Sequence, residues 1–188
     1  MDVRVTTIPG VQLLKPRYFY DSRGHFAETY SKRSGQELGL RARFVQDNES
    51  LSIRPGTVRG LHFQTPPKSQ AKLVRVLRGS IYDVAVDLRV GSPTYGRWAA
   101  DTLTADGGEQ FFVARGFAHG FCTLEPNTVV AYKVDNYYAP ECDQGLVWDD
   151  PTLAITWPVS AENAVLSDKD RKFGRFADFV SPFRYHHS

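Results

Sequence analysis

One histidine stands in the middle of a short stretch rich in β-forming residues, VRGLHFQ, residues 58–64. An imidazole has a reference pKa near ~6.5, so His62 can exchange a proton at neutral pH, and it can also bind a metal ion. Arg59, three residues earlier, can hold an anion through two parallel hydrogen bonds. A histidine on a strand is also often satisfied within the core. The residue types alone therefore leave three roles open for His62: catalytic base, metal ligand and core residue.

The composition indicates a soluble globular protein. The 188 residues are enough for one domain with a sizeable core, so we expect residues 1–188 to form a single domain with a short N-terminal extension and a C-terminal helical tail. A net charge of +2 is too small to suggest binding to nucleic acid. The first ten residues lack the apolar core of a signal peptide, and the sequence has no apolar run of membrane-spanning length and no CxxC pair. We therefore expect a cytoplasmic protein without nucleic-acid or membrane partners.

Strand-like segments dominate the chain, which predicts an all-β fold. They are short, rich in Val, Ile, Phe and Tyr, and separated by Gly, Pro, Asn and Asp. In residues 73–88 the apolar residues recur near period two on both sides of Arg78 and Gly79, which predicts a hairpin with one buried face. Helix signals are confined to residues 31–40, ended by Gly39, and to a stretch that begins at Ser167. A β-sandwich or jelly-roll barrel with a few short peripheral helices is the simplest architecture.

Two glycine and histidine spacings resemble the motifs of the jelly-roll cupins. Gly56 is followed by five residues and His62, and a second glycine frame ends at His119. Two positions that carry metal ligands in that frame hold Gln64 and Lys72 instead. An ammonium group cannot donate a lone pair, and its positive charge repels a cation, so we expect no metal and no cofactor. The two histidines His186 and His187 belong, we expect, to a terminal tail and not to a metal site.

A longer set of motifs resembles the dTDP-4-dehydrorhamnose 3,5-epimerase family. The motifs follow one another in order from about Leu13 to Arg171: DSRGHFAETY (21–30), FVQDNES (44–50), VRGLHFQ (58–64), KLVRVLRG (72–79), YDVAVDLRVGSPTYGRW (82–98), GFAHGF (116–121), YKVDNYYAPE (132–141), WDDP (148–151) and LSDKDR (166–171). The resemblance implies a metal-free cupin, usually a homodimer, that inverts C3 and C5 of dTDP-4-dehydro-6-deoxy-D-glucose to give dTDP-4-dehydro-L-rhamnose.

Four residues match the catalytic positions of that family. The resemblance implies that His62 is the base, that Asp170 orients it, and that Tyr132 is the acid which reprotonates the opposite face. Lys72 matches the lysine that stabilises the enolate, and removal of a proton beside a ketone requires such a charge at the C4 oxygen.

The resemblance also implies a set of contacts to the nucleotide sugar. Arg23, Arg59 and Lys169 match phosphate contacts, and Tyr138 matches a tyrosine that stacks on thymine. Asp143 stands where the family more often has glutamate, and Asp83 is a plausible partner of His119. The remaining expected substrate contacts are Phe26, Glu28, Gln46, Asp47, Asn48, Lys72 and His119.

Three other functions remain open at this point. Relatives of the same family invert only C3 or only C5, and the sequence does not show the shape of the pocket that decides between them. The other two are a metal-dependent cupin enzyme that uses His62 and His119, and a nucleotide-sugar binding protein without catalysis.

Overall fold

The computed structural model describes residues 1–185 and consists mainly of antiparallel strands. The expectation for His186 and His187 lies outside these described residues. The elements are β1 (Asp2–Val5), β2 (Val11–Lys15), β3 (Tyr18–Asp21), β4 (Gly24–Ala27), α1 (Lys32–Glu37), β5 (Gln46–Ser52), β6 (Val58–Gln64), β7 (Lys72–Arg78), β8 (Ser80–Asp87), β9 (Trp98–Thr104), β10 (Gln110–Val113), β11 (Phe117–Thr123), β12 (Thr128–Val134), β13 (Asp143–Gly145) and the 3₁₀ turns η1 (Pro140–Cys142), η2 (Asp170–Lys172) and η3 (Phe176–Asp178). The all-β prediction is confirmed.

Two sheets face each other across the core. One has six strands in the order β1-β2-β10-β7-β12-β5, and the other has five in the order β13-β6-β11-β8-β9. Apolar residues from both sheets, such as Val74, Phe111, Ile81 and Phe121, form one buried cluster between them. In residues 1–185 the strand order does not close, so the molecule is a sandwich and not a complete barrel. No helix in this part of the chain is long and apolar enough to cross a membrane.

The hairpin predicted around Gly79 is wrong. β7 belongs to the six-stranded sheet and β8 to the five-stranded sheet, so the chain crosses from one sheet to the other at this glycine. Gly79 has a φ of +79°, and a Cβ there would lie 2.4 Å from Oγ1 of Thr128. A corner between two sheets buries the same face of both strands as a hairpin does, so the alternating pattern cannot distinguish them.

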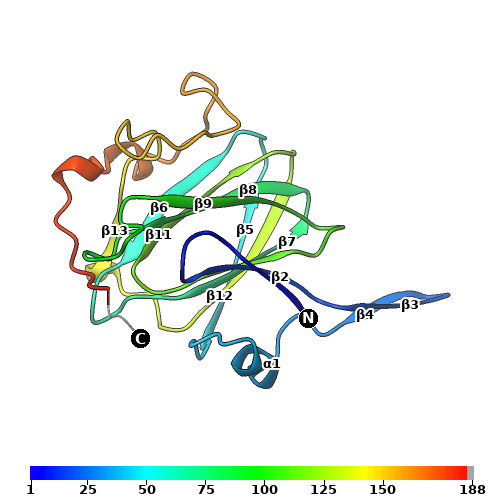
Figure 1. The fold of residues 1–188 in the computed structure, drawn as a ribbon. Coiled ribbons are helices and arrows are strands. Elements are labelled where there is room, and N and C mark those ends of the chain that lie inside the picture. Colours follow the sequence, from blue (N-terminus) through cyan, green and yellow to red (C-terminus); the bar gives the residue numbers. More distant parts are fainter. Residues whose placement is uncertain (186–188) are drawn as a thin grey trace.

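A two-stranded arm, β3 with β4, extends away from both sheets, on the side opposite to the orange and red C-terminal segment (Figure 1). Its large apolar side chains Phe19, Tyr20 and Phe26 are 54%, 75% and 70% exposed. Helix α1 follows the arm, and the Oγ of Ser31 accepts a hydrogen bond from the backbone N–H of Ser34 at its start. This helix was predicted from the sequence.

Up to residue 185, the C-terminal segment contains two short 3₁₀ turns and no α-helix, so its helical content is smaller than the sequence predicts. Ser167 does accept a hydrogen bond from the backbone N–H of Asp170 at 3.1 Å, as an N-cap would, but only the short 3₁₀ turns η2 and η3 follow. The segment is instead fastened to the sheets by backbone bridges between Thr57 and Val165 and between Leu146 and Gly174. These bridges bring η2 against β6.

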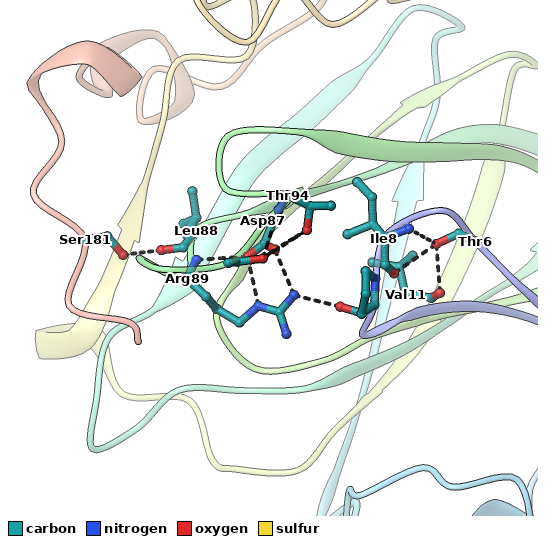
Figure 2. A network of polar contacts seen from close by, with 10 residues as sticks. Thr6, Ile8, Val11, Asp87, Leu88, Arg89, Thr94 and Ser181 are labelled. Atoms are coloured by element: carbon teal, nitrogen blue, oxygen red, sulfur yellow. Dashed lines mark hydrogen bonds and ion pairs between the residues drawn. The ribbon is translucent and has the colours of Figure 1, made fainter. Parts of the chain in front are cut away.

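A buried ionic network fixes the loop that follows β8 (Figure 2). The carboxylate of Asp87 is fully buried and accepts hydrogen bonds from the guanidinium of Arg89 at 2.8 and 2.9 Å and from the hydroxyl of Thr94 at 2.7 Å. Arg89 also donates to the carbonyl of Pro9 at 2.7 Å, and Ser181 donates to the carbonyl of Leu88. The network therefore joins the N-terminal and C-terminal segments to the same end of the five-stranded sheet.

Candidate active site

A cleft with a volume of about 360 Å³ opens between the two sheets and holds most of the titratable residues singled out in the sequence. A second hollow adjoins it, and His62, Lys72, Tyr132 and Lys169 line both. β6 and β11 supply one wall of the cleft and β5, β7 and β12 the other, while the segment 165–170 closes one side. We treat the two hollows as two parts of one site.

His62 and Asp170 form a close pair although they lie 108 residues apart in the chain. Nε2 of His62 is 2.5 Å from Oδ1 of Asp170, and Asp170 is only 3% exposed. A carboxylate accepts hydrogen bonds, so the imidazole Nε2–H is the donor, and Nδ1 is left as the basic nitrogen of the neutral ring. The Phe173 ring packs against the imidazole in a T-shaped arrangement, with the ring centroids 5.6 Å apart. His62 is therefore held in one tautomer and one orientation, as a general base requires.

A second histidine–carboxylate pair lies directly beside the first. His119 on β11 is the register partner of His62 on β6, and its Nε2 is 2.6 Å from Oδ1 of the fully buried Asp83. Burial lowers the pKa of His119, and the charges of Lys72 and His62 act in the same direction against the attraction of Asp83. At neutral pH His119 is therefore a neutral ring with Nδ1 available as a hydrogen-bond acceptor.

Lys72, the first residue of β7, brings a positive charge into the cleft beside these two pairs. Burial of its ammonium group lowers the pKa of Lys72 to about 8, although the carboxylates of Asp83 and Asp143 favour the charged form. The side chain is mainly protonated at neutral pH. A cation that is poorly solvated by water interacts strongly with negative charge that develops on a bound molecule.

Tyr132 on β12 projects from the six-stranded sheet, opposite the sheet that carries His62. Burial raises the pKa of Tyr132, and the charge of Arg59 acts against this increase. Nε of Arg59 donates to Oγ of Ser52 at 3.1 Å, and the same guanidinium donates to the carbonyl of Leu51 at 3.0 Å. The arrangement places a proton acceptor on one wall, a proton donor on the other, and an ammonium group in the same cleft.

At the rim of the cleft, Asp143 connects two residues that were expected to bind the nucleotide. The hydroxyl of Tyr138 donates to Oδ2 of Asp143 at 2.9 Å, and Lys169 forms an ion pair with the same oxygen. Hydrogen bonding to Asp143 raises the pKa of Tyr138. The shorter aspartate therefore still reaches both neighbours.

The family model described as dTDP-4-dehydrorhamnose 3,5-epimerase matches residues 5–178. The chain belongs to this family. The enzyme of that name from Sinorhizobium fredii is 48% identical over 179 residues, which cover 95% of this chain and 91% of the relative. The dTDP-4-dehydrorhamnose 3-epimerase from Streptomyces niveus is 38% identical over 91% of this chain and 82% of its own length. A crystal structure of dTDP-6-deoxy-D-glucose-3,5-epimerase from Legionella pneumophila, in complex with dTDP-4-keto-L-rhamnose, has a TM-score of 0.93, 40% identity and 99% coverage of both chains.

The cleft of this epimerase-family chain brings together most, but not all, of the residues that the sequence singled out. Arg23 and Phe26 lie in the exposed arm, and Glu28 follows it and accepts a hydrogen bond from Ser34 at 2.8 Å. Asp47 lies on the outer face of the six-stranded sheet and pairs with Lys133 at 2.7 Å. The expected contacts that do line the cleft are Gln46, Asn48, Arg59, His62, Lys72, His119, Tyr132, Tyr138, Asp143, Lys169 and Asp170.

Gln64, which replaces a metal-binding histidine of the cupin frame, uses its side chain to hold the backbone of a neighbouring loop. Its Nε2 donates to the carbonyls of Lys68 and Tyr137, and its Oε1 accepts from the N–H of Ala139. Within the described part of the chain, no group of three or more His, Cys, Asp or Glu side chains is arranged to hold a metal ion. The amide thereby supports the segment that carries Tyr138, a structural role that the sequence did not indicate.

Proposed function

We propose that this chain inverts C3 and C5 of dTDP-4-dehydro-6-deoxy-D-glucose and so forms dTDP-4-dehydro-L-rhamnose. The observation that carries the proposal is the opposition of His62 and Tyr132 across a cleft that also contains Lys72. An epimerase must remove a proton from one face of a carbon and return one to the other face. A base and an acid on opposite walls have the geometry for this reaction.

In the proposed reaction, Nδ1 of His62 removes the proton from the carbon next to the C4 ketone. The electron pair of the C–H bond forms the enolate, whose negative oxygen is stabilised by the ammonium group of Lys72. The Tyr132 hydroxyl then gives its proton to the opposite face of the carbon, and the enolate returns to the ketone. The imidazolium loses its proton and the phenolate regains one before the second carbon reacts. His119 contributes a hydrogen-bond acceptor near the reacting ring.

The nucleotide supplies most of the binding free energy in this proposal. Arg59 and Lys169 hold the diphosphate, and Tyr138, with Gln46 and Asn48 beside it, receives the base. Oε1 of Gln46 accepts a hydrogen bond from the backbone N–H of Tyr138 at 3.2 Å, which supports this grouping.

We further propose a cytoplasmic homodimer in which the arm of one subunit completes the cleft of the other. Two observations support this assembly: the aromatic side chains of the arm are exposed, and Arg23, Phe26 and Glu28 do not line the cleft of their own chain. Two inactive variants, Arg23→Ala and His62→Ala, test it when they are mixed and allowed to exchange subunits. In mixed dimers one cleft contains neither substitution, so random exchange should restore about a quarter of the wild-type activity. Mixed samples that stay inactive would exclude shared sites.

Incubation with the keto-sugar nucleotide in D₂O tests the reaction itself. We expect NMR to show deuterium at both C3 and C5 of the sugar, in a buffer in which the protein is folded. Deuterium at one carbon only would replace the proposal by a single epimerisation, the activity named for the Streptomyces niveus relative. Absence of exchange at both carbons would leave a binding function.

A further inference from the structure

The hydroxyl of Ser50 is buried and has no hydrogen-bond partner among residues 1–185. Such groups are rare, because a buried hydroxyl that gives up water without a replacement costs free energy. Ser50 lines the cleft together with Arg59, His119, Phe121 and Tyr132. The unpaired oxygen therefore belongs to the site and not to a packing defect elsewhere in the core.

The register of β5 places Ser50 at the level of the reacting groups. Ser50 pairs with Val130 of β12, and the next cleft-facing residue along β5, Asn48, pairs with Tyr132. Ser50 is thus the diagonal neighbour of Tyr132 across the two strands. Along the cleft it lies between Tyr132 and the guanidinium of Arg59, which Ser52 holds.

The other polar side chains in the same row of β5 have partners within the protein. Gln46 donates to Oδ1 of Asn48 at 2.8 Å, and Ser52 accepts from Arg59 at 3.1 Å. These contacts fix the positions of groups that surround the substrate. In this row, Gln46, Asn48, Ser50 and Ser52, only the hydroxyl of Ser50 is buried without a hydrogen-bond partner in the described chain.

We propose that the Ser50 hydroxyl binds an oxygen atom of the hexose and so contributes to specificity for the sugar. This inference rests on the proposed function, because it assumes that the hexose lies between Tyr132 and His62. The diphosphate is served by the guanidinium of Arg59, which is a charged donor and suits an anion. A neutral serine beside Tyr132, His119 and Phe121 suits a hydroxyl, ketone or ring oxygen of the sugar.

Calorimetric titration of Ser50→Ala with two nucleotides tests the assignment without any catalytic step. The nucleotides are dTDP and dTDP-6-deoxy-D-glucose, whose C4 hydroxyl replaces the ketone so that no epimerisation can occur. We expect Kd for dTDP to stay within about twofold, and Kd for the nucleotide sugar to rise by about 3- to 10-fold, the effect of one neutral hydrogen bond. An equal rise for both nucleotides would assign the hydroxyl to the diphosphate, and no rise for either would remove it from recognition; both results overturn the proposal.

Thermal unfolding of the ligand-free variant gives an independent measurement. Because the hydroxyl of Ser50 has no partner, its removal should leave Tm unchanged or raise it. Ser80→Ala is the control, since Ser80 is a buried serine whose hydroxyl has a partner and donates to Glu125 at 2.6 Å. We expect the control to lower Tm and to leave both Kd values unchanged. A fall in Tm for Ser50→Ala would show a partner within the protein and contradict the proposal.

These measurements separate the failure of this inference from the failure of the proposed function. Wild-type protein that binds the nucleotide sugar but exchanges no deuterium would contradict the epimerase reaction and leave the assignment of Ser50 intact. Wild-type protein that exchanges deuterium, with equal nucleotide-sugar affinity in wild type and Ser50→Ala, would refute only the role of Ser50.

Discussion

Replacement of Lys72 by methionine should make the protein more stable and nearly inactive. The pKa of Lys72 falls from 10.5 to about 8 in the folded chain because its ammonium group is buried. One pKa unit corresponds to ~1.36 kcal/mol, so the protonated side chain costs about 3 kcal/mol relative to the neutral amine. This value already includes the attraction of Asp83 and Asp143. Methionine has a similar length and no charge, and it should recover most of that free energy.

The pH dependence of the gain gives the sharper test. Between about pH 8 and 10.5 the unfolded chain binds more protons at Lys72 than the folded chain does, so wild-type stability rises with pH in this window. The advantage of Lys72→Met should therefore be about 3 kcal/mol at pH 7 and should shrink toward zero near pH 10.5.

Urea unfolding at a fixed protein concentration measures the gain in the free energy of unfolding at pH 7 and near pH 10.5. Lys172→Met, which replaces an exposed lysine, is the control and should change the free energy of unfolding by no more than about 0.5 kcal/mol. The rate of deuterium exchange should fall by about 10² to 10³ in Lys72→Met, the usual effect of losing one group that stabilises an oxyanion. A variant that is less stable at pH 7, or whose advantage does not depend on pH, would refute the assignment of a buried ammonium.

Three further predictions concern the same cleft. The kcat/KM of the wild type should fall as the pH rises through about 8, where Lys72 loses its proton, and Lys72→Arg should move that fall to higher pH; a profile that is flat up to pH 10 would contradict the role of the ammonium. In steady-state kinetics, Asp170→Asn should lower kcat by about 10² to 10⁴, whereas Asp168→Asn, which changes an exposed carboxylate, should leave kcat unchanged. Equal activities of the two variants would contradict the role of the pair formed by Asp170 and His62. In urea titrations, Gly60→Ala should lower the free energy of unfolding by about 2 to 4 kcal/mol, because Gly60 has a φ of +147° and an added Cβ would lie 2.5 Å from the backbone of β11. Gly174→Ala is the control and should change the free energy of unfolding little, because nothing lies within 4 Å of its added Cβ.

The sequence predicts the strands well but not the sheet to which each belongs. The period-two pattern on both sides of Gly79 correctly indicates two strands with one buried face each, and it cannot show that they lie in opposite sheets. The end of the chain was overpredicted for a related reason. Ser167 provides a cap, but Gly174 forms a backbone bridge with Leu146, next to β13, and only the short 3₁₀ turns η2 and η3 form in this segment. Tertiary contacts override local helix signals here.

The residues of the cleft also differ in how well the sequence predicts their roles. The cupin-like spacing singled out the positions of His62 and Lys72, whereas Asp170 was proposed only from the resemblance to the family. Gln46, Asp47 and Asn48 could not all contact one ligand, because successive residues of a strand point to opposite faces. Asp47 accordingly lies on the outer face. The alternation of side chains along β5 could have predicted that Asp47 faces away from Gln46 and Asn48.

Ser50 carried no signal of its own in the sequence. A serine among polar residues of a strand is ordinary, and only the absence of a partner in the folded chain distinguishes it from Ser52. Unsatisfied groups are defined by three-dimensional surroundings, so this kind of site residue is visible only in the structure.

The attachment of η2 to β6 has a consequence for the order in which the protein becomes competent during synthesis. Every strand of both sheets ends by Gly145, so all of them are synthesised before Asp170. An N-terminal portion of this length can begin to fold as it emerges. His62 then has its place in the cleft but lacks the carboxylate that fixes its tautomer. We therefore expect a chain that ends before Asp170 to lack a functional base, and catalysis to require the docking of η2 against β6.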